Sequence, residues 1–314
     1  MKFTLETTIP QTLHLKRLDL ALSALVPEHS RARLQKWIKA GFVKVNDKFL
    51  RAKDKVLSGQ IIKINAVIEN TSEDNPQAMP LNIIYQDEDI LVLNKPVGLV
   101  IHPGAGQKDN TLLNGLLHQF PELHKIPRAG IVHRLDKNTS GLLVVARNLT
   151  AQTKLVKALQ KHDITRIYTA LVNGVMTAGG TIVAPIGRHK TKRTHMSVIG
   201  SGKPATTHYR VLKRFACHTL VELKLETGRT HQIRVHLAHI NYPIVGDNVY
   251  GTRVRIPANC SKELRSALQN FKHQALHASC LILKHPVTRE TLKFEAPLPE
   301  DMVMLLNSFE GKGD

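Results

Sequence analysis

The 314 residues of the chain allow one large domain or two, and an apolar fraction of 42% is enough for a packed core. Its 44 Lys and Arg against 25 Asp and Glu give a net charge of +19, which favours nucleic acid as a partner before an anionic membrane. The sequence has neither an apolar run near the ~18 residues of a membrane span nor a signal-peptide layout. Three widely spaced cysteines exclude a disulfide framework and a Cys-x-x-Cys zinc site, so we expect a reduced, cytoplasmic protein with no membrane role.

The first expected domain covers residues 1–65. Leucines at helical spacing predict a first helix that ends before Pro27. Ser30 and Gly41 then offer the N-cap and C′ positions of a second helix. Short strands around a turn at Asn46 and Asp47 complete a small sheet.

The second helix, expected at residues 31–40, has an inward apolar face and an outward basic face. A charged helix face is usually only solvated. Two helices ahead of a small sheet, with basic residues on the second helix, nevertheless resemble an S4-type RNA-binding domain. Together with the net charge, this resemblance implies RNA contacts by three residues of the helix: Arg31, Arg33 and Lys36.

Residues 66–80 are polar and acidic and are expected to be a linker to a second domain at residues 81–314. Strands are expected at residues 83–85, 90–94, 142–146, 167–172, 181–184, 206–212, 219–225, 276–283 and 291–295. Helices are expected at residues 151–161 after a Thr150 cap, at 231–240 after a Thr230 cap, at 262–271 and 300–309, and up to Leu117 after Asp109 or Asn110. Many strands with clustered helices predict an α+β fold with a mixed, largely antiparallel sheet.

The motif most suggestive of chemistry is His-Arg-Leu-Asp at residues 133–136, within GIVHRLDKNTSGLLVVARN. The apolar run that follows predicts a buried strand, so Asp136 stands at the mouth of a rigid element, as a reactive group requires. The plainer interpretation is a surface turn, in which the Asp136 carboxylate bonds local backbone. Spacing alone does not decide between the two.

Four further blocks accompany this motif in a fixed order: VLNKPVGLVIHPGAG, RIYTALVNG, RHKTKRTHM and ETGRTHQIRVHLAHINYPIVGD. From Lys16 to about Leu305 the chain resembles the RluA-type pseudouridine synthases. The resemblance implies the pseudouridine synthase fold and the site-specific isomerisation of uridine to pseudouridine. It also implies ribosomal RNA of the large subunit as the partner, at the 23S stem-loop called helix 69. We expect the protein to act as a monomer.

The resemblance also assigns the catalytic residues. Asp136 is the expected nucleophile, or the electrostatic partner of a positive sugar carbon, and must be ionised in a dry pocket. Arg234 is the expected cation beside it, and Tyr168 is expected to stack on the uracil and to relay the C5 proton. Without the resemblance, Arg234 would be an ordinary surface arginine of a helix and Tyr168 a core residue.

Three more residues of these blocks are expected to bind the RNA. A base in a stem-loop must be flipped out before it can react, and the planar guanidinium of Arg134 could fill the gap that it leaves. His133 is expected to help hold the phosphodiester. Lys95 is expected to be structural or to contact phosphate.

A dense basic loop in the fourth block includes Arg188, Lys192 and Arg193. Such a loop could simply be solvated, but on an RNA enzyme we expect it to grip the RNA backbone. No cofactor is expected, because the isomerisation needs neither redox chemistry nor a group donor and the sequence lacks phosphate-loop and dinucleotide motifs. A metal is not expected at His231, His236 and His239, because no Cys or carboxylate stands beside them at ligand spacing.

Two other functions remain open from the sequence. A non-catalytic rRNA-binding factor in assembly of the large ribosomal subunit could keep this fold. A base-excising glycosidase would also need a flipped base and an Asp. The residues alone do not separate these alternatives from an isomerase.

Overall fold

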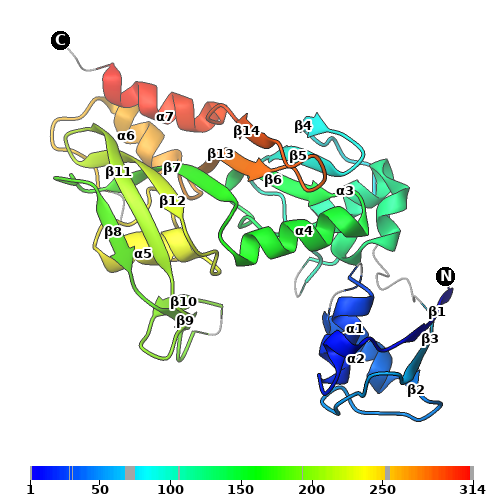
Figure 1. Ribbon diagram of the computed structural model, residues 1–314. Helices are drawn as coiled ribbons and strands as arrows, with labels where there is room; N and C mark the ends of the chain where they lie inside the picture. Colours follow the sequence, from blue (N-terminus) through cyan, green and yellow to red (C-terminus); the bar gives the residue numbers. More distant parts are fainter. Residues whose placement is uncertain are drawn as a thin grey trace.

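The structure, a computed structural model, describes residues 2–27, 29, 31–67, 75–104, 107–192, 194–251 and 255–311. Ser30, Arg193 and part of the expected linker lie outside these described residues. Figure 1 shows a small N-terminal sheet with its helices in blue, and a larger sheet that carries the remaining helices. Among the described residues, no helix has the length and apolar character needed to cross a bilayer.

The N-terminal sheet has the order β1-β3-β2 and is antiparallel throughout. Its elements are β1 (Lys2–Thr8), η1 (Gln11–Leu13), α1 (Leu18–Leu25), α2 (Arg31–Lys39), β2 (Val43–Val45) and β3 (Ile61–Val67). The expected inward face of α2 is confirmed, since Leu34, Trp37 and Ile38 are buried in a core of this region's own residues. Strand β1 was not expected, although the alternation of apolar and polar residues in KFTLETT is the pattern of a half-buried strand.

The large sheet has nine strands in the order β4-β5-β6-β13-β7-β12-β11-β8, with β14 paired to β13. Their bounds are β4 (Ile83–Gln86), β5 (Ile90–Lys95), β6 (Ser140–Ala146), β7 (Thr165–Asn173), β8 (Gly180–Val183), β11 (Thr206–Arg214), β12 (His218–Leu225), β13 (Leu276–Lys284) and β14 (Thr291–Glu295). Neighbours are antiparallel except β13 and β6, which run parallel. The expected α+β fold with a mixed, largely antiparallel sheet is therefore confirmed.

Helices cover both faces of this sheet, as α3 and α4 illustrate (Figure 1). The helical elements are α3 (Leu112–Gln119), η2 (Pro121–Lys125), η3 (Pro127–Gly130), α4 (Leu149–Gln160), α5 (Gln232–His239), α6 (Lys262–Asn270) and α7 (Glu300–Glu310). On β6, Leu143 and Val145 enter the core that includes α3, whereas Leu142 and Val144 enter the core beneath α4. Burial on both faces explains why β6 is a continuous apolar run.

Three expected helix caps are wrong. Helix α3 begins at Thr111, whose side chain forms a capping box with Asn114, and not at Asp109 or Asn110. Helix α4 is capped by Asn148 in place of Thr150. Helix α5 has His231 at its N-cap instead of Thr230, in a left-handed conformation.

The basic loop of the fourth block contains secondary structure that was not expected. Strands β9 (Ile186–Arg188) and β10 (Met196–Val198) pair as a short antiparallel hairpin. The hairpin projects beyond β8 (Figure 1) and exposes Arg188 and Lys192. It thus presents basic side chains on an element of its own.

Candidate active site

The turn that carries Asp136 is fixed to the large sheet on two sides. Thr139 N–H donates to the Asp136 carbonyl at 3.1 Å, which closes the turn just before β6. At the start of β6, Gly141 has φ +110° and lies against β13. A Cβ at this position would lie 2.3 Å from the Ala278 carbonyl oxygen, so only glycine allows the two strands to approach here. Asp136 therefore stands on a rigid support, as expected.

Arg234, from helix α5, lies between two carboxylates. Its Nη1 donates to Asp136 Oδ2 at 2.9 Å, whereas its Nε and Nη2 make a two-pronged contact with Asp247 at 2.7 and 2.9 Å. The side chains of Arg234 and Asp247 are 6% and 0% exposed, whereas that of Asp136 is 16% exposed. The structure therefore joins Asp136 and Arg234 and leaves part of the Asp136 carboxylate open to a substrate.

Asp247 is the residue that holds Arg234 in its charged form. Burial acts to raise the pKa of Asp247, but hydrogen bonds and charge from Arg234 and the backbone N–H groups of Tyr250 and Val249 lower it. Burial acts to lower the pKa of Arg234, but Asp247 and Asp136 raise it well above its ordinary value. Both groups stay ionised at neutral pH, so Asp136 faces a permanent positive charge.

Tyr168 lies on β7 and is buried. Burial raises the pKa of its hydroxyl; the charge of Arg166 opposes this rise and that of Asp136 adds to it. The raised pKa keeps the phenol protonated at neutral pH, so it is a hydrogen-bond donor before it is a base.

Lys95 is buried and fits the structural role of the two that were expected. Its Nζ donates to the carbonyl oxygens of Pro96, Leu99 and Lys137 at 2.7, 3.0 and 3.0 Å, which match the three N–H groups of an ammonium. Burial lowers its pKa to about 7, against the charge of Asp136. Contact with RNA phosphate would require Lys95 to give up these bonds. One of them holds the carbonyl of Lys137, the residue after Asp136.

His133 also takes a structural position. Its Nε2 accepts a hydrogen bond from Val144 N–H at 3.1 Å. Burial, with the charge of Arg166 in the same direction, lowers its pKa to about 3. The ring is thus neutral and bound to β6, which does not suit a grip on phosphodiester. Arg134, by contrast, is exposed and precedes Asp136 by two residues.

Comparisons with known proteins point to one family. A family model described as RNA pseudouridylate synthase matches residues 89–239, which include Asp136, Tyr168 and Arg234. A ribosomal large subunit pseudouridine synthase D of Yersinia pestis is 53% identical over 307 residues, covering 98% of this chain and 94% of that protein. The protein of the same name from Haemophilus influenzae is 52% identical over 94% of this chain and 91% of its own length.

The chain belongs to the RNA pseudouridine synthase family. It is an RNA pseudouridine synthase, as the sequence predicted. The solved human RNA pseudouridylate synthase domain containing 4 matches 73% of this chain and 93% of its own with a TM-score of 0.58 and 28% identity. A model of the S4 domain matches residues 16–62, which confirms the expected S4-like domain at the N-terminus.

The basic residues of that S4 domain differ in exposure. Lys36 is exposed, as expected. Arg31 is also exposed, but its guanidinium is bonded to the buried carboxylate of Asp19 at 2.8 Å. Arg33 is only partly exposed, and burial lowers its pKa. Of the three expected RNA contacts, Lys36 is thus the one most directly offered to solvent.

The synthase site includes residues that the sequence interpretation missed. Asp247 closes the fifth block but was given no role, although a carboxylate in that block could have been suspected as the partner of Arg234. His231 was considered only as a metal ligand, and Tyr250 was not considered. In the structure, Tyr250 stacks against the Arg234 guanidinium at 5.0 Å from the ring centroid.

The three histidines of the fifth block do not form a common site. His236 is buried, with Nδ1 2.9 Å from Thr207 Oγ1 and Nε2 2.9 Å from the Ala184 carbonyl oxygen. Within the described residues, possible metal-ligand atoms converge instead at Asp87, Asp89 and His285. His285 Nδ1 accepts from the backbone N–H groups of Val287 and Thr288, and its Nε2 lies 3.1 Å from Asp87 Oδ2 without forming a hydrogen bond.

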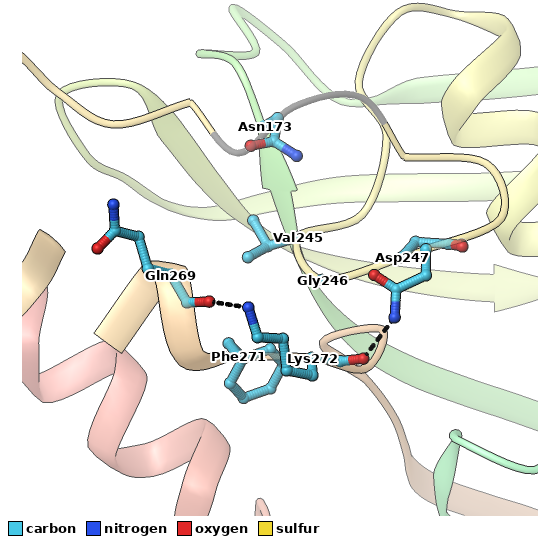
Figure 2. A pocket seen from close by; sticks show the side chains of 8 residues that line it. Asn173, Val245, Gly246, Asp247, Gln269, Phe271 and Lys272 are labelled. Carbon is cyan, nitrogen blue, oxygen red and sulfur yellow. Dashed lines mark hydrogen bonds between the residues drawn. The ribbon is translucent and has the colours of Figure 1, made fainter. Parts of the chain in front are cut away.

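A small pocket lies behind the turn that carries Asp247 (Figure 2). Its volume is about 70 Å³, and it is lined by the Asp247 turn, by Asn173 at the end of β7 and by the segment around the end of α6, which includes Lys272. Figure 2 shows the Lys272 amine turned to the Gln269 carbonyl. Asn248 Nδ2 donates to the Lys272 carbonyl at 2.7 Å. The pocket holds water molecules at most and is not the site for a nucleotide.

Proposed function

We propose that this synthase converts uridine to pseudouridine in 23S ribosomal RNA, at the helix 69 stem-loop, with Asp136 as the nucleophile. The relatives at 52–53% identity are named for the large ribosomal subunit and match over nearly the whole chain. The S4 domain and the net charge of +19 supply the means to bind a folded RNA. The proposal assigns RNA binding to residues 1–65 and catalysis to residues 81–314.

One observation carries the catalytic part of the proposal: a partly exposed carboxylate beside a buried and permanently charged arginine. Arg234 donates a hydrogen bond to Oδ2 of Asp136 at 2.9 Å and is itself held by Asp247. Asp136 is thereby oriented in its anionic form, which can attack the uridine as the C1′–N1 bond breaks. The released uracil turns, and its C5 bonds to C1′ as the bond from C1′ to the Asp136 carboxylate breaks. The C5 proton is then lost and N1 takes up a proton, which gives pseudouridine.

Tyr168 and Arg134 complete the proposed reaction. The buried ring of Tyr168 packs against the flipped uracil, and its protonated hydroxyl donates a hydrogen bond and relays the C5 proton in the last step. The exposed guanidinium of Arg134 fills the stack that the uridine leaves, which offsets an unstacking cost of a few kcal/mol. The exposed Arg188 and Lys192 of the β9–β10 hairpin contact the RNA backbone.

The decisive experiment maps pseudouridine in rRNA from cells that lack the endogenous gene and express either Asp136→Asn or a matched control. Asp163→Asn is a suitable control, because Asp163 is exposed and distant in sequence from the catalytic motif. We expect at least a 10³-fold loss of the modification rate in Asp136→Asn and no loss in the control. Full modification of helix 69 by Asp136→Asn contradicts the proposed nucleophile.

The same experiment addresses two other functions. A non-catalytic assembly factor predicts that Asp136→Asn restores ribosome assembly while purified wild-type protein leaves uridine unchanged. A glycosidase predicts free uracil and a lighter RNA, whereas an isomerase leaves the RNA mass unchanged. Mass spectrometry of the RNA and the supernatant after reaction with wild-type protein separates these outcomes.

A further inference from the structure

His231 has a backbone conformation that calls for an explanation. Its φ of 57° and ψ of 21° are left-handed, which is uncommon for a residue other than glycine, and such residues cluster at functional sites. It occupies the N-cap position of α5, yet its side chain does not cap the helix. The imidazole turns instead toward Tyr250, whose hydroxyl lies 2.7 Å from Nδ1. The strain thus serves the placement of this ring.

The contact with Tyr250 guides the assignment of the proton on the His231 ring. The Tyr250 oxygen already accepts a hydrogen bond from Met196 N–H at 2.8 Å, so we assign its own proton to the contact with His231 Nδ1. Nδ1 is then the acceptor, and Nε2 of the neutral ring carries the proton. The structure therefore presents an N–H donor from His231 on the side away from Tyr250.

The charges around His231 favour this neutral form. Burial lowers the pKa of the imidazole, and the guanidinium groups of Arg234 and Arg134 act in the same direction. The carboxylates of Asp136 and Asp247 oppose them without reversing the shift. A ring that stays neutral keeps one donor and one acceptor, as the contact with Tyr250 requires.

The Nε2–H donor of His231 faces the carboxylate of Asp136, but the two do not form a hydrogen bond. His231 Nε2 lies 3.8 Å from Asp136 Oδ1, beyond hydrogen-bond distance, and the two side chains are 20% and 16% exposed. A substrate oxygen beside the line between them can lie about 2.8 Å from both atoms. That group must accept from Nε2–H and donate to the carboxylate. A hydroxyl does both, whereas a uracil carbonyl only accepts and the uracil N3–H only donates.

We propose that His231 and Asp136 together bind the 2′-hydroxyl of the target uridine, which makes His231 a specificity-determining residue for ribose over deoxyribose. The inference rests on the proposed function, because a carboxylate that reacts at C1′ has the 2′-hydroxyl on the adjacent carbon. Glycosidases gain from sugar 2-hydroxyl contacts at the same place, since these strengthen in the transition state. The 2′-hydroxyl is also the group that distinguishes RNA from DNA.

Tyr250 acts in this arrangement as a positioning residue. Its hydroxyl joins His231 to Met196, the first residue of β10, and its ring packs against the Arg234 guanidinium at 5.0 Å. His195 of the basic hairpin also lies edge-on to this ring, at 5.9 Å between centroids. Tyr250 therefore connects the hairpin that holds the RNA backbone to the donor that reads the sugar.

The test compares two RNA stem-loops that differ only in having uridine or 2′-deoxyuridine at the target position. For each protein variant, kcat/KM is measured on both RNAs and their ratio is taken. His231→Asn removes the imidazole but tolerates the left-handed backbone. We expect it to lose about tenfold on the uridine RNA, the equivalent of one hydrogen bond, and little on the deoxyuridine RNA. The ratio therefore falls by about tenfold.

Two further variants make the result specific. His239→Asn, on an exposed position of the same helix, is expected to keep the wild-type ratio. Tyr250→Phe retains the ring against Arg234 and removes only the hydroxyl, so we expect the ratio to fall in the same direction as for His231→Asn. A ratio unchanged in His231→Asn, with active wild-type protein, overturns this inference alone. Wild-type protein that forms no pseudouridine in either RNA overturns the proposed function as well.

Discussion

Asp19 in the S4 domain and Asp136 in the catalytic domain are both held by arginine, but only Asp136 keeps part of its carboxylate accessible. Asp19 has no exposed surface, and its oxygens accept from Arg17, Arg31 and Gln35. Asp136 gives one oxygen to Arg234 and turns the other toward a histidine donor 3.8 Å away. A carboxylate and an arginine thus form a closed site in the S4 domain, where the carboxylate is fully buried. They form an open site in the catalytic domain, where the carboxylate is partly exposed.

The two sites differ in which partner of the ion pair is buried, the carboxylate or the arginine. In the S4 domain the carboxylate is inside and the arginines are 46% exposed, so solvent shares their charge. In the catalytic domain the arginine is inside and needs a second carboxylate, Asp247, to remain there. Asp247 satisfies most of the guanidinium and leaves Asp136 available to the substrate.

The largest expected effect is therefore that of Arg234→Leu. This change leaves the buried carboxylate of Asp247 without its cation, which we expect to lower the free energy of unfolding by about 3–5 kcal/mol and to abolish activity. The matched change Arg31→Leu is expected to cost only about 1 kcal/mol or less, because Arg17 remains beside Asp19 and the charge that is removed is half exposed. Urea denaturation of both variants measures the contrast, and equal losses would contradict it.

Lys95→Met is the next test, because Lys95 holds the turn of the open site. Three carbonyl oxygens lose their donor in this variant, and we expect a loss of roughly 2 kcal/mol or more. The Asp136 turn should loosen as well, so kcat should fall. Lys137→Met removes a neighbouring exposed charge and is the control for stability. Unchanged stability in Lys95→Met would mean that its three hydrogen bonds contribute nothing.

The closed site is tested by acid. Burial acts to raise the pKa of Asp19, but hydrogen bonds from Arg31, Gln35 and Arg17 lower it to about 2. The pKa of this carboxyl in the unfolded chain is about 3.9. The contribution of Asp19 to the free energy of unfolding is therefore complete above that pH and is lost as the pH falls toward 2. Trp37, the single tryptophan, lies in the S4 core and reports unfolding by fluorescence. In Asp19→Asn, which we expect to cost about 1–3 kcal/mol, this acid-dependent step should disappear.

The smallest expected effect concerns RNA affinity. Lys36→Ala removes an exposed charge and should reduce the salt dependence of rRNA binding by about one phosphate contact. Arg31→Ala should reduce it less, because its guanidinium already bonds Asp19. Filter binding at several salt concentrations gives both slopes. A larger change for Arg31 would show that the closed contact opens on RNA.

Much of the fold could be predicted from the sequence because its patterns are local. The apolar run of β6, the leucine spacing of α1 and the glycine after α2 each determine their element through nearby residues. Helix caps were less predictable, since several polar residues compete at each start. Asn148 and Thr111 are the N-caps because their side chains accept a hydrogen bond from a free backbone N–H of the first turn.

The site was predictable only in part, for a different reason. Asp136 and Arg234 came from motifs, but their contact spans 98 residues and depends on the tertiary fold. The roles of Asp247, His231 and Tyr250 depend on which atoms face one another, and no spacing in the sequence encodes that. Lys95 and His133 showed the converse, because a polar residue in a motif can be directed entirely at the protein's own backbone.

The position of β13 has a consequence for when the large sheet is completed. The strand that brings Asp136 is β6 and the one that brings Tyr168 is β7, and β13 lies between them although it is made about a hundred residues later. A nascent chain that has left the ribosome only as far as residue 275 lacks β13, the strand that joins the two halves of the sheet. The sheet that holds both Asp136 and Tyr168 is therefore complete only after β13 has been synthesised.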